Sequence, residues 1–261
     1  MSFIVKILNG FYSFSFPCFL LKENYVFVSY LLHFIRLMKK GLFIVVDGTD
    51  WSWKKTQTDA LVTRLSWEWY EVEKIDFPQY GKPSAGPTEQ YLNWKFWSAD
   101  DVSPYQASIL YAVDRFSAAN TIRKWLDEWK IVISDRYVSA NMWHQAWKIS
   151  DLLERDKFLE WLENLEYWIL NIPRPDVQVF LYLDPEISRN LALKVTKPNM
   201  DKTKDVHEND ANHMRKASEA FLYVAEKFKR IKIDCAVDWV MRTREDIWAE
   251  LYDKIQSYLS K

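Results

Sequence analysis

Residues 42–57 read LFIVVDGTDWSWKKTQ, and this stretch decides the fold. The run Leu42–Val46 is all apolar and rich in β-branched residues, which is typical of a strand buried on both faces of a sheet. Gly48 and Lys54 follow at the spacing of a phosphate-binding loop, G-x-x-x-x-G-K-[ST], and a helix pattern begins near Thr56. In such a loop backbone N–H groups surround phosphate oxygens, and the Lys reaches the outer phosphates. The stretch therefore predicts a strand, a phosphate-binding loop and a helix.

Two positions of this loop depart from the pattern. Trp53 stands where the second glycine is required, and Lys55 replaces the Ser or Thr that normally contacts Mg²⁺. An indole at position 53 is expected to occupy the volume of the phosphate and to disfavour the left-handed backbone that the loop uses. Thr56 is a weaker candidate for the missing hydroxyl. With these residues the loop is predicted to bind ATP poorly.

Tryptophan is abundant in this chain and glycine is scarce, with 14 Trp and 5 Gly in 261 residues. An ordinary chain of this length has about 18 Gly, at roughly 7% of residues. Trp129 falls between a predicted helix and a predicted strand, where a left-handed glycine is most expected, and Trp67 and Trp69 fall in a similar turn. One interpretation is a Trp-rich core or a stacking surface.

The other interpretation is a matter of decoding. Some genetic codes read UGA as Gly and another reads it as Trp, so translation with the wrong table places Trp at Gly positions. Reading Gly for Trp converts residues 47–57 into DGTDGSGKKTQ, a regular phosphate-binding loop. This hypothesis predicts that most of the 14 Trp codons are TGA.

Composition and charge indicate a soluble globular protein, with 49% hydrophobic and 27% charged residues. The net charge is −1, which gives no overall field to attract nucleic acid or an anionic membrane, so neither is an expected partner. Two cysteines form no disulfide framework, and a reducing, cytoplasmic location is expected.

The N-terminal residues 1–37 differ in composition from the rest, because Phe, Tyr, Leu and Ile dominate and charges are few. Their apolar runs are shorter than the ~20 residues of a membrane-spanning helix. The favoured interpretation is that Met38 is the natural start and that residues 1–37 are upstream sequence read in frame. A membrane-associating anchor and a structural extension are the alternatives. The domain is accordingly predicted to span residues 38–261.

Strand and helix patterns alternate along residues 38–261, which predicts an α/β fold with a five-stranded parallel sheet flanked by helices in three layers. Besides the first strand, strands are predicted at Glu71–Ile75, Ile131–Ser134, Val177–Leu183 and Ile231–Asp234. Helices are predicted at Thr56–Leu65, Pro104–Asp127, Asp151–Leu170, Ser188–Val195, Asn209–Lys229 and Arg244–Leu259.

Further motifs follow the loop in order: Phe77-Pro78, then Tyr111 and Arg115 on the long helix, then Asp135-Arg136-Tyr137 after a strand, then Gln145. With them, the chain from about Lys40 to its C-terminus resembles the thymidylate kinase family of P-loop nucleoside monophosphate kinases. The resemblance implies the three-layer P-loop kinase fold and transfer of a phosphoryl group from ATP to dTMP with Mg²⁺. It also implies a homodimer.

The residue chemistry agrees, because a kinase that brings two polyanions together needs several cations aimed at one point. Lys54, Arg136 and Asp135 are the predicted catalytic residues, with Asp135 holding Mg²⁺. The ATP-binding residues are predicted to be Gly48, Thr49, Asp50, Trp51, Ser52, Trp53, Lys54, Lys55 and Thr56. The resemblance assigns dTMP binding to Asp50, Phe77, Pro78, Tyr111, Arg115, Arg136, Tyr137, Asn141 and Gln145.

Some features leave alternatives open. Gln79 stands where many family members have an Arg for the substrate phosphate, with Lys82 a candidate helper, and His144 is either a base contact or a packed ring. The basic segment 194–208 resembles a lid over ATP. The rival functions are another deoxynucleotide or deoxynucleoside kinase, and a non-catalytic nucleotide-binding protein should Trp51 and Trp53 be genuine.

Overall fold

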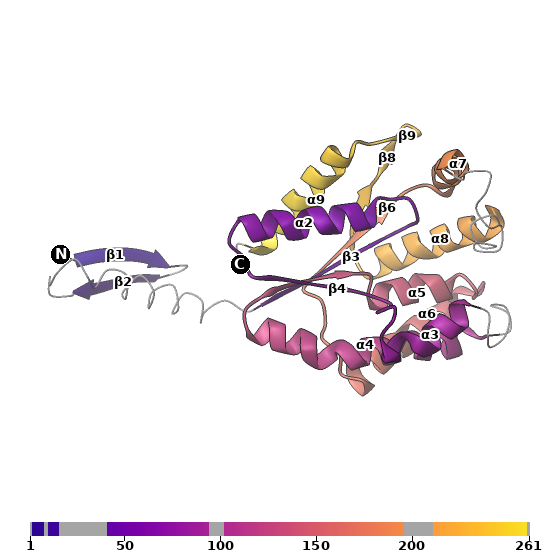
Figure 1. Cartoon of the computed structure of the whole chain (residues 1–261), viewed down its shortest axis with the longest axis horizontal. Coiled ribbons are helices and arrows are strands. Elements are labelled where there is room, and N and C mark those ends of the chain that lie inside the picture. The colour runs from indigo at the N-terminus through magenta and orange to yellow at the C-terminus, as the bar shows by residue number, and fades with distance from the viewer. Residues whose placement is uncertain (1, 8–9, 16–40, 94–101, 196–210, 260–261) are drawn as a thin grey trace. The chain divides into compact units, whose positions relative to one another are not determined.

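The computed structural model describes residues 2–7, 10–15, 41–93, 102–195 and 211–259 (Figure 1). The chain forms two units, Met1–Lys40 and Gly41–Lys261. In the first unit, β1 (Ser2–Ile7) and β2 (Gly10–Ser15) pair as an antiparallel hairpin that the sequence analysis did not predict. Within the described residues, no helix combines the length and apolar character needed to cross a membrane.

The second unit is built on a five-stranded parallel sheet, as predicted, and its strand order is β4-β5-β3-β6-β7. Its strands are β3 (Leu42–Gly48), β4 (Val72–Asp76), β5 (Ile131–Asp135), β6 (Val177–Tyr182) and β7 (Ile231–Asp234). The helices in the described residues are α2 (Lys54–Trp67), α3 (Gly86–Leu92), α4 (Pro104–Asp127), α5 (Val138–Ala146), α6 (Leu152–Glu163), α7 (Pro185–Val195), α8 (Ala211–Lys227) and α9 (Arg244–Leu259).

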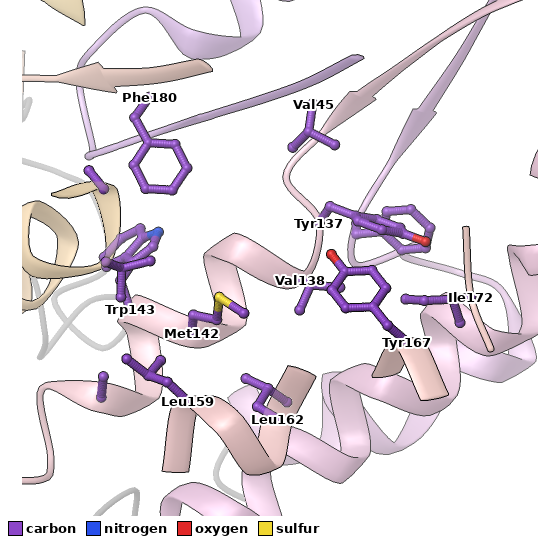
Figure 2. Packing of buried hydrophobic residues seen from close by; sticks show 14 of the residues in the cluster. Val45, Tyr137, Val138, Met142, Trp143, Leu159, Leu162, Tyr167, Ile172 and Phe180 are labelled. Atoms are coloured by element: carbon purple, nitrogen blue, oxygen red, sulfur yellow. The ribbon is translucent and has the colours of Figure 1, made fainter. Parts of the chain in front are cut away.

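Helices cover both faces of this sheet, which confirms the three-layer α/β fold. Helices α2 and α9 lie against one face, and α4, α5, α6 and α8 lie against the other (Figure 1). Side chains of the central strand β3 alternate between the two faces of the sheet, so this strand contributes to the core on each side. Phe43 and Val45 belong to the core under α4–α6 and α8, whereas Ile44 and Val46 belong to the core under α2 and α9. Figure 2 shows the first of these cores, where Val45 and Phe180 face residues of α5 and α6.

Helix α5 was not predicted, although it carries two predicted substrate residues. Eight of its nine residues are buried, polar ones among them, and nine residues are fewer than the roughly 11–18 over which helical periodicity is recognised in a sequence. The short helix α3 was also not predicted. Nor was the small hairpin of β8 (Ala236–Val237) and β9 (Val240–Met241).

The helix predicted for Asp151–Leu170 is not continuous. Helix α6 ends at Glu163 and a π-helical turn, η2 (Asn164–Ile169), follows it. Such turns are rare and are frequent at functional sites. This one buries Glu166, whose side chain is fully excluded from solvent.

Candidate active site

A cleft of about 680 Å³ opens where the carboxyl ends of the parallel strands meet, the edge at which α/β sheets bind ligands. Its walls include the residues that directly follow β3, β4 and β5. Twelve of the predicted site residues line it: Thr49, Asp50, Lys54, Phe77, Pro78, Tyr111, Arg115, Asp135, Arg136, Tyr137, Asn141 and Gln145. The fold therefore gathers every residue predicted to bind dTMP and all three predicted catalytic residues around one space.

The loop after β3 is held in place by its own polar groups. Thr49 Oγ1 donates to the carbonyl of Leu183 at 3.1 Å and accepts from the N–H of the same residue at 2.9 Å. Ser188 Oγ donates to the Asp50 carbonyl at 3.1 Å. At Gly48 a Cβ would lie 2.9 Å from the backbone oxygen of Leu181, so only glycine fits there. The loop is thus fastened to the end of β6 and the start of α7.

The two loop tryptophans adopt left-handed backbones, with φ 63° at Trp51 and 59° at Trp53. Trp53 is the N-cap of α2. Both side chains pack on the core under α2 and α9, the Arg244 guanidinium lies 4.8 Å from the Trp53 ring, and neither residue lines the cleft. The Trp53 indole therefore lies outside this cleft. The cost of Trp lies in the backbone conformation instead.

Three charged side chains meet at the floor of the cleft. Lys54 Nζ forms an ion pair with Asp135. Arg136 follows Asp135, and its Nη1 lies 2.6 Å from His144 Nε2 while its Nη2 lies 3.5 Å from Asp50 Oδ1. His144 also stacks on Trp143, with ring centroids 3.6 Å apart. His144 thus orients Arg136. The sequence analysis had offered only a base contact or a packed ring for His144.

Burial and neighbouring charges together shift the pKa values of Lys54 and Arg136. Burial and then the neighbouring Arg136 lower the pKa of Lys54, against the opposing effect of Asp135. For Arg136 burial is the largest single influence and lowers the pKa, but the carboxylates of Asp50, Asp47 and Asp135 act together against it and the pKa is raised. Two cations therefore lie side by side at one point, which is the arrangement that a polyanionic ligand requires.

Asp47 is a buried acid that the sequence analysis missed. It is fully excluded from solvent and accepts from the Gly48 N–H at 2.9 Å and from Trp143 Nε1 at 3.2 Å. Burial raises the pKa of Asp47, with Arg136 and Lys54 opposing the shift. Its place directly before the loop glycine, near the carboxyl end of β3, was a signal that could have identified it.

We expect a comparison of the parent chain with the Asp47→Asn variant to reveal the raised pKa of Asp47. The folded chain takes up the Asp47 proton at a higher pH than the unfolded chain, so acidification from pH 7 toward pH 4 favours the folded state. The unfolding free energy of the parent chain should therefore rise relative to the variant, by at most about 1.4 kcal/mol per pH unit. Urea unfolding of both chains at several pH values measures the difference, and a difference that falls on acidification would contradict the assignment.

Arg115 enters the cleft wall as part of a buried ion pair. Its guanidinium donates to Glu166 through Nε at 3.0 Å and through Nη2, and the two side chains are 2% and 0% exposed. The predicted base-reading Arg therefore has two of its nitrogens committed to a carboxylate. Glu166 was missed, because it is 51 residues away in sequence and no local pattern links the two.

The remaining residues predicted to bind the substrate lie in different environments. Tyr137 is 1% exposed, packs between Phe43 and Phe77, and donates to the Pro173 carbonyl at 3.1 Å, so it shapes the wall by packing. Asn141 and Gln145 are buried, and their side-chain carbonyl oxygens accept no hydrogen bond from the described residues. Buried acceptors are rarely left unpaired, so these two favour a ligand with N–H groups.

Other predicted residues lie outside the cleft. Lys55 is 74% exposed and pairs with Asp59 at 3.1 Å, Thr56 is also exposed, and neither lines the cleft. Gly48 and Ser52 support the loop without lining the cleft. Lys82 donates to the side chain of Gln79, which is itself bonded to Asp114. Residues 196–208 of the predicted lid lie outside the described residues, as do Trp94 and Trp97.

We expect Lys55→Ala to leave ATP turnover unchanged within about two-fold. Its ammonium is solvent-exposed, and surface ion pairs contribute about 0–1 kcal/mol. A coupled ADP-release assay at saturating ATP tests this, with Lys157→Ala on α6 as a control for loss of one exposed charge. A loss above ten-fold would mean that Lys55 reaches the phosphates.

Comparison with known proteins agrees with this geometry. The sequence pattern of the thymidylate kinase family matches residues 46–246. A thymidylate kinase of Mycobacterium tuberculosis is 25% identical over 185 residues, covering 70% of this chain and 86% of that protein. A probable thymidylate kinase of Pyrococcus abyssi is 28% identical over 216 residues, covering 80% and 95%. The fold is similar to the solved thymidylate kinase of Candida albicans, with a TM-score of 0.61, 23% identity, and coverage of 84% of this chain and 92% of that one. With its loop, its cleft and more than half of its length matched, the chain belongs to the thymidylate kinase family.

Proposed function

We propose that this chain transfers the γ-phosphoryl group of ATP to dTMP. The observation that carries the proposal is the single cleft that joins Lys54, Arg136 and Asp135 to every residue predicted to bind dTMP. In this reaction an oxygen of the dTMP phosphate attacks the γ-phosphorus. The bond from that phosphorus to the β,γ-bridging oxygen breaks, giving dTDP and ADP.

The side chains act by positioning and by charge, since phosphoryl transfer needs little covalent chemistry from a protein. Lys54, at the start of α2, binds the β- and γ-phosphates of ATP and exchanges its ion pair with Asp135 for them. Arg136 reaches the acceptor phosphate and the transferred group, oriented by Asp50 and His144. Lys54 pairs with the largely buried carboxylate of Asp135 and Arg136 with the half-exposed carboxylate of Asp50, so both charges are held in place before the ligands arrive.

Asp135 is the residue that fits Mg²⁺ best. It lies at the end of β5, lines the cleft and is joined to Lys54, the predicted phosphate ligand. No cluster of three metal-binding side chains occurs in the part of the chain that the structure describes. Kinase sites hold Mg²⁺ through one or two carboxylates with substrate phosphates and water, so one Asp suffices. Mg²⁺, when bound, neutralises charge on the phosphate oxygens.

The inner end of the cleft suits a pyrimidine base. Asn141 and Gln145 offer unpaired carbonyl oxygens, and Arg115 offers a cation fixed by Glu166. Burial raises the pKa of Tyr111, which keeps its phenol neutral and available for stacking. Donors and acceptors together match the edge of thymine.

A coupled ATP assay across dTMP, dUMP, dCMP, dGMP and thymidine tests the proposal. Turnover should be greatest with dTMP, and equal or better turnover of thymidine would overturn it. The assay is best run on both the tryptophan-containing chain and a Trp51→Gly/Trp53→Gly chain. The second candidate, a nucleotide-binding protein without turnover, is favoured by Trp53 and Lys55; Mg·ATP binding without turnover in the glycine chain would establish it.

Helix α4 offers a surface for the homodimer that the family resemblance implies. Its exposed apolar residues recur at helical spacing along one face: Tyr105, Ile109, Val113 and Phe116, which are 37–54% exposed. A contiguous exposed apolar stripe is typical of an interface. We therefore propose that two copies pack through α4.

Phe116→Glu is expected to convert a dimer into a monomer, because a charge in the middle of an apolar interface is buried without a partner. Sedimentation velocity measures the change. Val240→Glu places the same charge on another exposed apolar residue and should leave the dimer intact. A variant that sediments like the parent chain would rule out α4 as the interface.

Further parts of the proposal rest on the sequence. We place the enzyme in the cytoplasm, without nucleic-acid or membrane partners. The segment 194–208 is proposed as the lid, and the kinase domain as residues 38–261.

A further inference from the structure

We propose that the tryptophans of this chain are of two kinds: Trp51, Trp53, Trp69, Trp129 and Trp239 stand at glycine positions, whereas Trp125 and Trp161 are genuine. The structure thereby sharpens the decoding hypothesis, because backbone conformation assigns each residue separately. Only the loop pair, Trp51 and Trp53, bears on the proposed kinase function; the other three positions are independent of it.

Left-handed backbone angles are concentrated on tryptophan. Positive φ occurs at nine non-glycine residues of the described chain: Trp51, Trp53, Trp69, Trp129, Arg136, Asn171, Lys229, Asp238 and Trp239. Five of these are Trp, and Trp94 and Trp97 fall outside the described residues, so five of the twelve described tryptophans are left-handed. Asn and Asp tolerate this region, but for bulky residues it is a genuine outlier. A random set of tryptophans would not show this preference.

Two of the five occupy a type of helix end that favours glycine. At the end of α4 the Trp129 N–H donates to Leu126 O at 3.1 Å and the Lys130 N–H donates to Trp125 O at 3.0 Å. At the end of α2 the Trp69 and Tyr70 N–H groups make the same two bonds, to Ser66 O and Leu65 O. This is the Schellman motif, whose left-handed residue is usually Gly.

The end of α8 repeats this motif with another residue. Lys229 has φ 49° and takes the left-handed place, with its N–H bonded to Glu226 O. A single non-glycine residue is therefore tolerated at a helix end in this fold. What distinguishes tryptophan is its recurrence at such positions.

Trp239 lies in a two-residue hairpin turn. Val237 pairs with Val240, and the residues between them, Asp238 and Trp239, have φ 48° and 64°. Positive φ at both positions defines a type I′ turn, for which Asp-Gly is among the strongest sequence preferences. Read with glycine, the turn becomes Asp-Gly.

Side-chain packing does not offset the backbone strain at Trp69 and Trp239. Trp69 is 95% exposed and Trp239 is 69% exposed. An indole in water contributes no burial that would compensate for a left-handed backbone.

Trp125 and Trp161 differ in every one of these respects. Trp125 lies within α4 and Trp161 within α6, both with helical backbone, and both pack on the core between those helices and the sheet. The Trp161 ring meets that of Tyr105 edge-on, with centroids 4.7 Å apart. Glycine at a helix interior would lose this packing and the helical propensity as well.

The gene gives the first test. We expect TGA at codons 51, 53, 69, 129 and 239 and TGG at codons 125 and 161. Peptide mass spectrometry of the protein from its own cells should find glycine and tryptophan in the same pattern. TGG at the left-handed positions, or TGA at both 125 and 161, would overturn the proposal.

A stability measurement tests the physical basis without any ligand. The triple variant Trp69→Gly/Trp129→Gly/Trp239→Gly should raise the Tm of the chain by roughly 5 °C, since each site is relieved of a left-handed non-glycine backbone. The matched control, Trp161→Gly, should lower the Tm by a similar amount. A triple variant that loses stability as the control does would refute the assignment.

Restoring the loop separates this proposal from the kinase function. Trp51→Gly/Trp53→Gly should strengthen Mg·ATP binding at least ten-fold by equilibrium titration, because the loop then adopts its left-handed angles freely. If the remote triple variant gains stability and ATP binding improves but dTMP is not phosphorylated, the glycine assignment stands and the proposed function fails. If the remote triple variant gains no stability while dTMP is phosphorylated, the glycine assignment fails and the proposed function stands.

Discussion

Arg136→Met is expected to lower the kcat for dTMP phosphorylation about 10³-fold while leaving the fold intact. Cationic groups that stabilise a transferring phosphoryl group contribute about 10²–10⁵ in rate. Arg136 is oriented by His144 Nε2 at 2.6 Å and by Asp50, so its charge is pre-positioned. Methionine keeps most of the side-chain length and the same backbone requirement, φ 64°, but removes the charge.

Single-turnover and steady-state assays with saturating ATP and dTMP measure this loss. Arg64→Met on the outer face of α2 is the matched control, because Arg64 is half-exposed and pairs only with neighbouring groups on the surface. Its kcat should match that of the parent chain. An Arg136 variant within ten-fold of the parent would remove Arg136 from the catalytic residues.

Glu166→Gln is expected to cost about 3–5 kcal/mol of stability, the usual penalty for leaving one buried charge without its partner. For a chain of this size that is a fall in Tm of roughly 10 °C. Arg115 and Glu166 are 2% and 0% exposed, so water cannot replace the missing carboxylate. Because Arg115 lines the cleft, the KM for dTMP should also rise, while the KM for ATP stays unchanged.

A double-mutant cycle shows whether this is a pairwise effect. Replacing both residues, as Arg115→Met/Glu166→Met, should destabilise less than Glu166→Gln alone, since neither charge is then buried unpaired. Glu154→Gln breaks an exposed pair with Lys157 on α6 and should change stability by less than about 0.5 kcal/mol. Equal effects of Glu166→Gln and Glu154→Gln would show that the buried pair contributes nothing.

The sheet and the loop could be predicted from local sequence because their signals are local. Runs such as Leu42–Val46 are short, apolar at every position and rich in β-branched residues, which is the pattern of a strand covered on both faces. The spacing of Gly48 and Lys54 between a strand and a helix indicates a phosphate-binding loop in the same way. Helix α5 gave no such signal, because its nine residues are too few to establish a helical period.

The candidate site also combines features that local sequence predicts with features that it does not. Twelve of the residues that line the cleft were predicted, from the phosphate-binding loop and from the family motifs at strand ends and on the adjoining helices. The sequence analysis missed Asp47 and Glu166, and it did not show that the Trp53 side chain packs on the core under α2 and α9. Burial, ion pairing and side-chain direction depend on elements far apart in the chain.

From the sequence alone came the α/β order and the phosphate-binding loop, because spacing and periodicity are properties of neighbouring residues, and that loop and the family resemblance together supplied twelve of the residues that line the cleft. The sequence also raised the question of glycine and tryptophan, but composition could not separate one tryptophan from another. Tertiary structure decided which tryptophans are left-handed, which carboxylates hold Lys54, Arg136 and Arg115, and where each indole points. The physical reason is that backbone strain and desolvation arise only when distant segments fix a residue in one conformation and one environment.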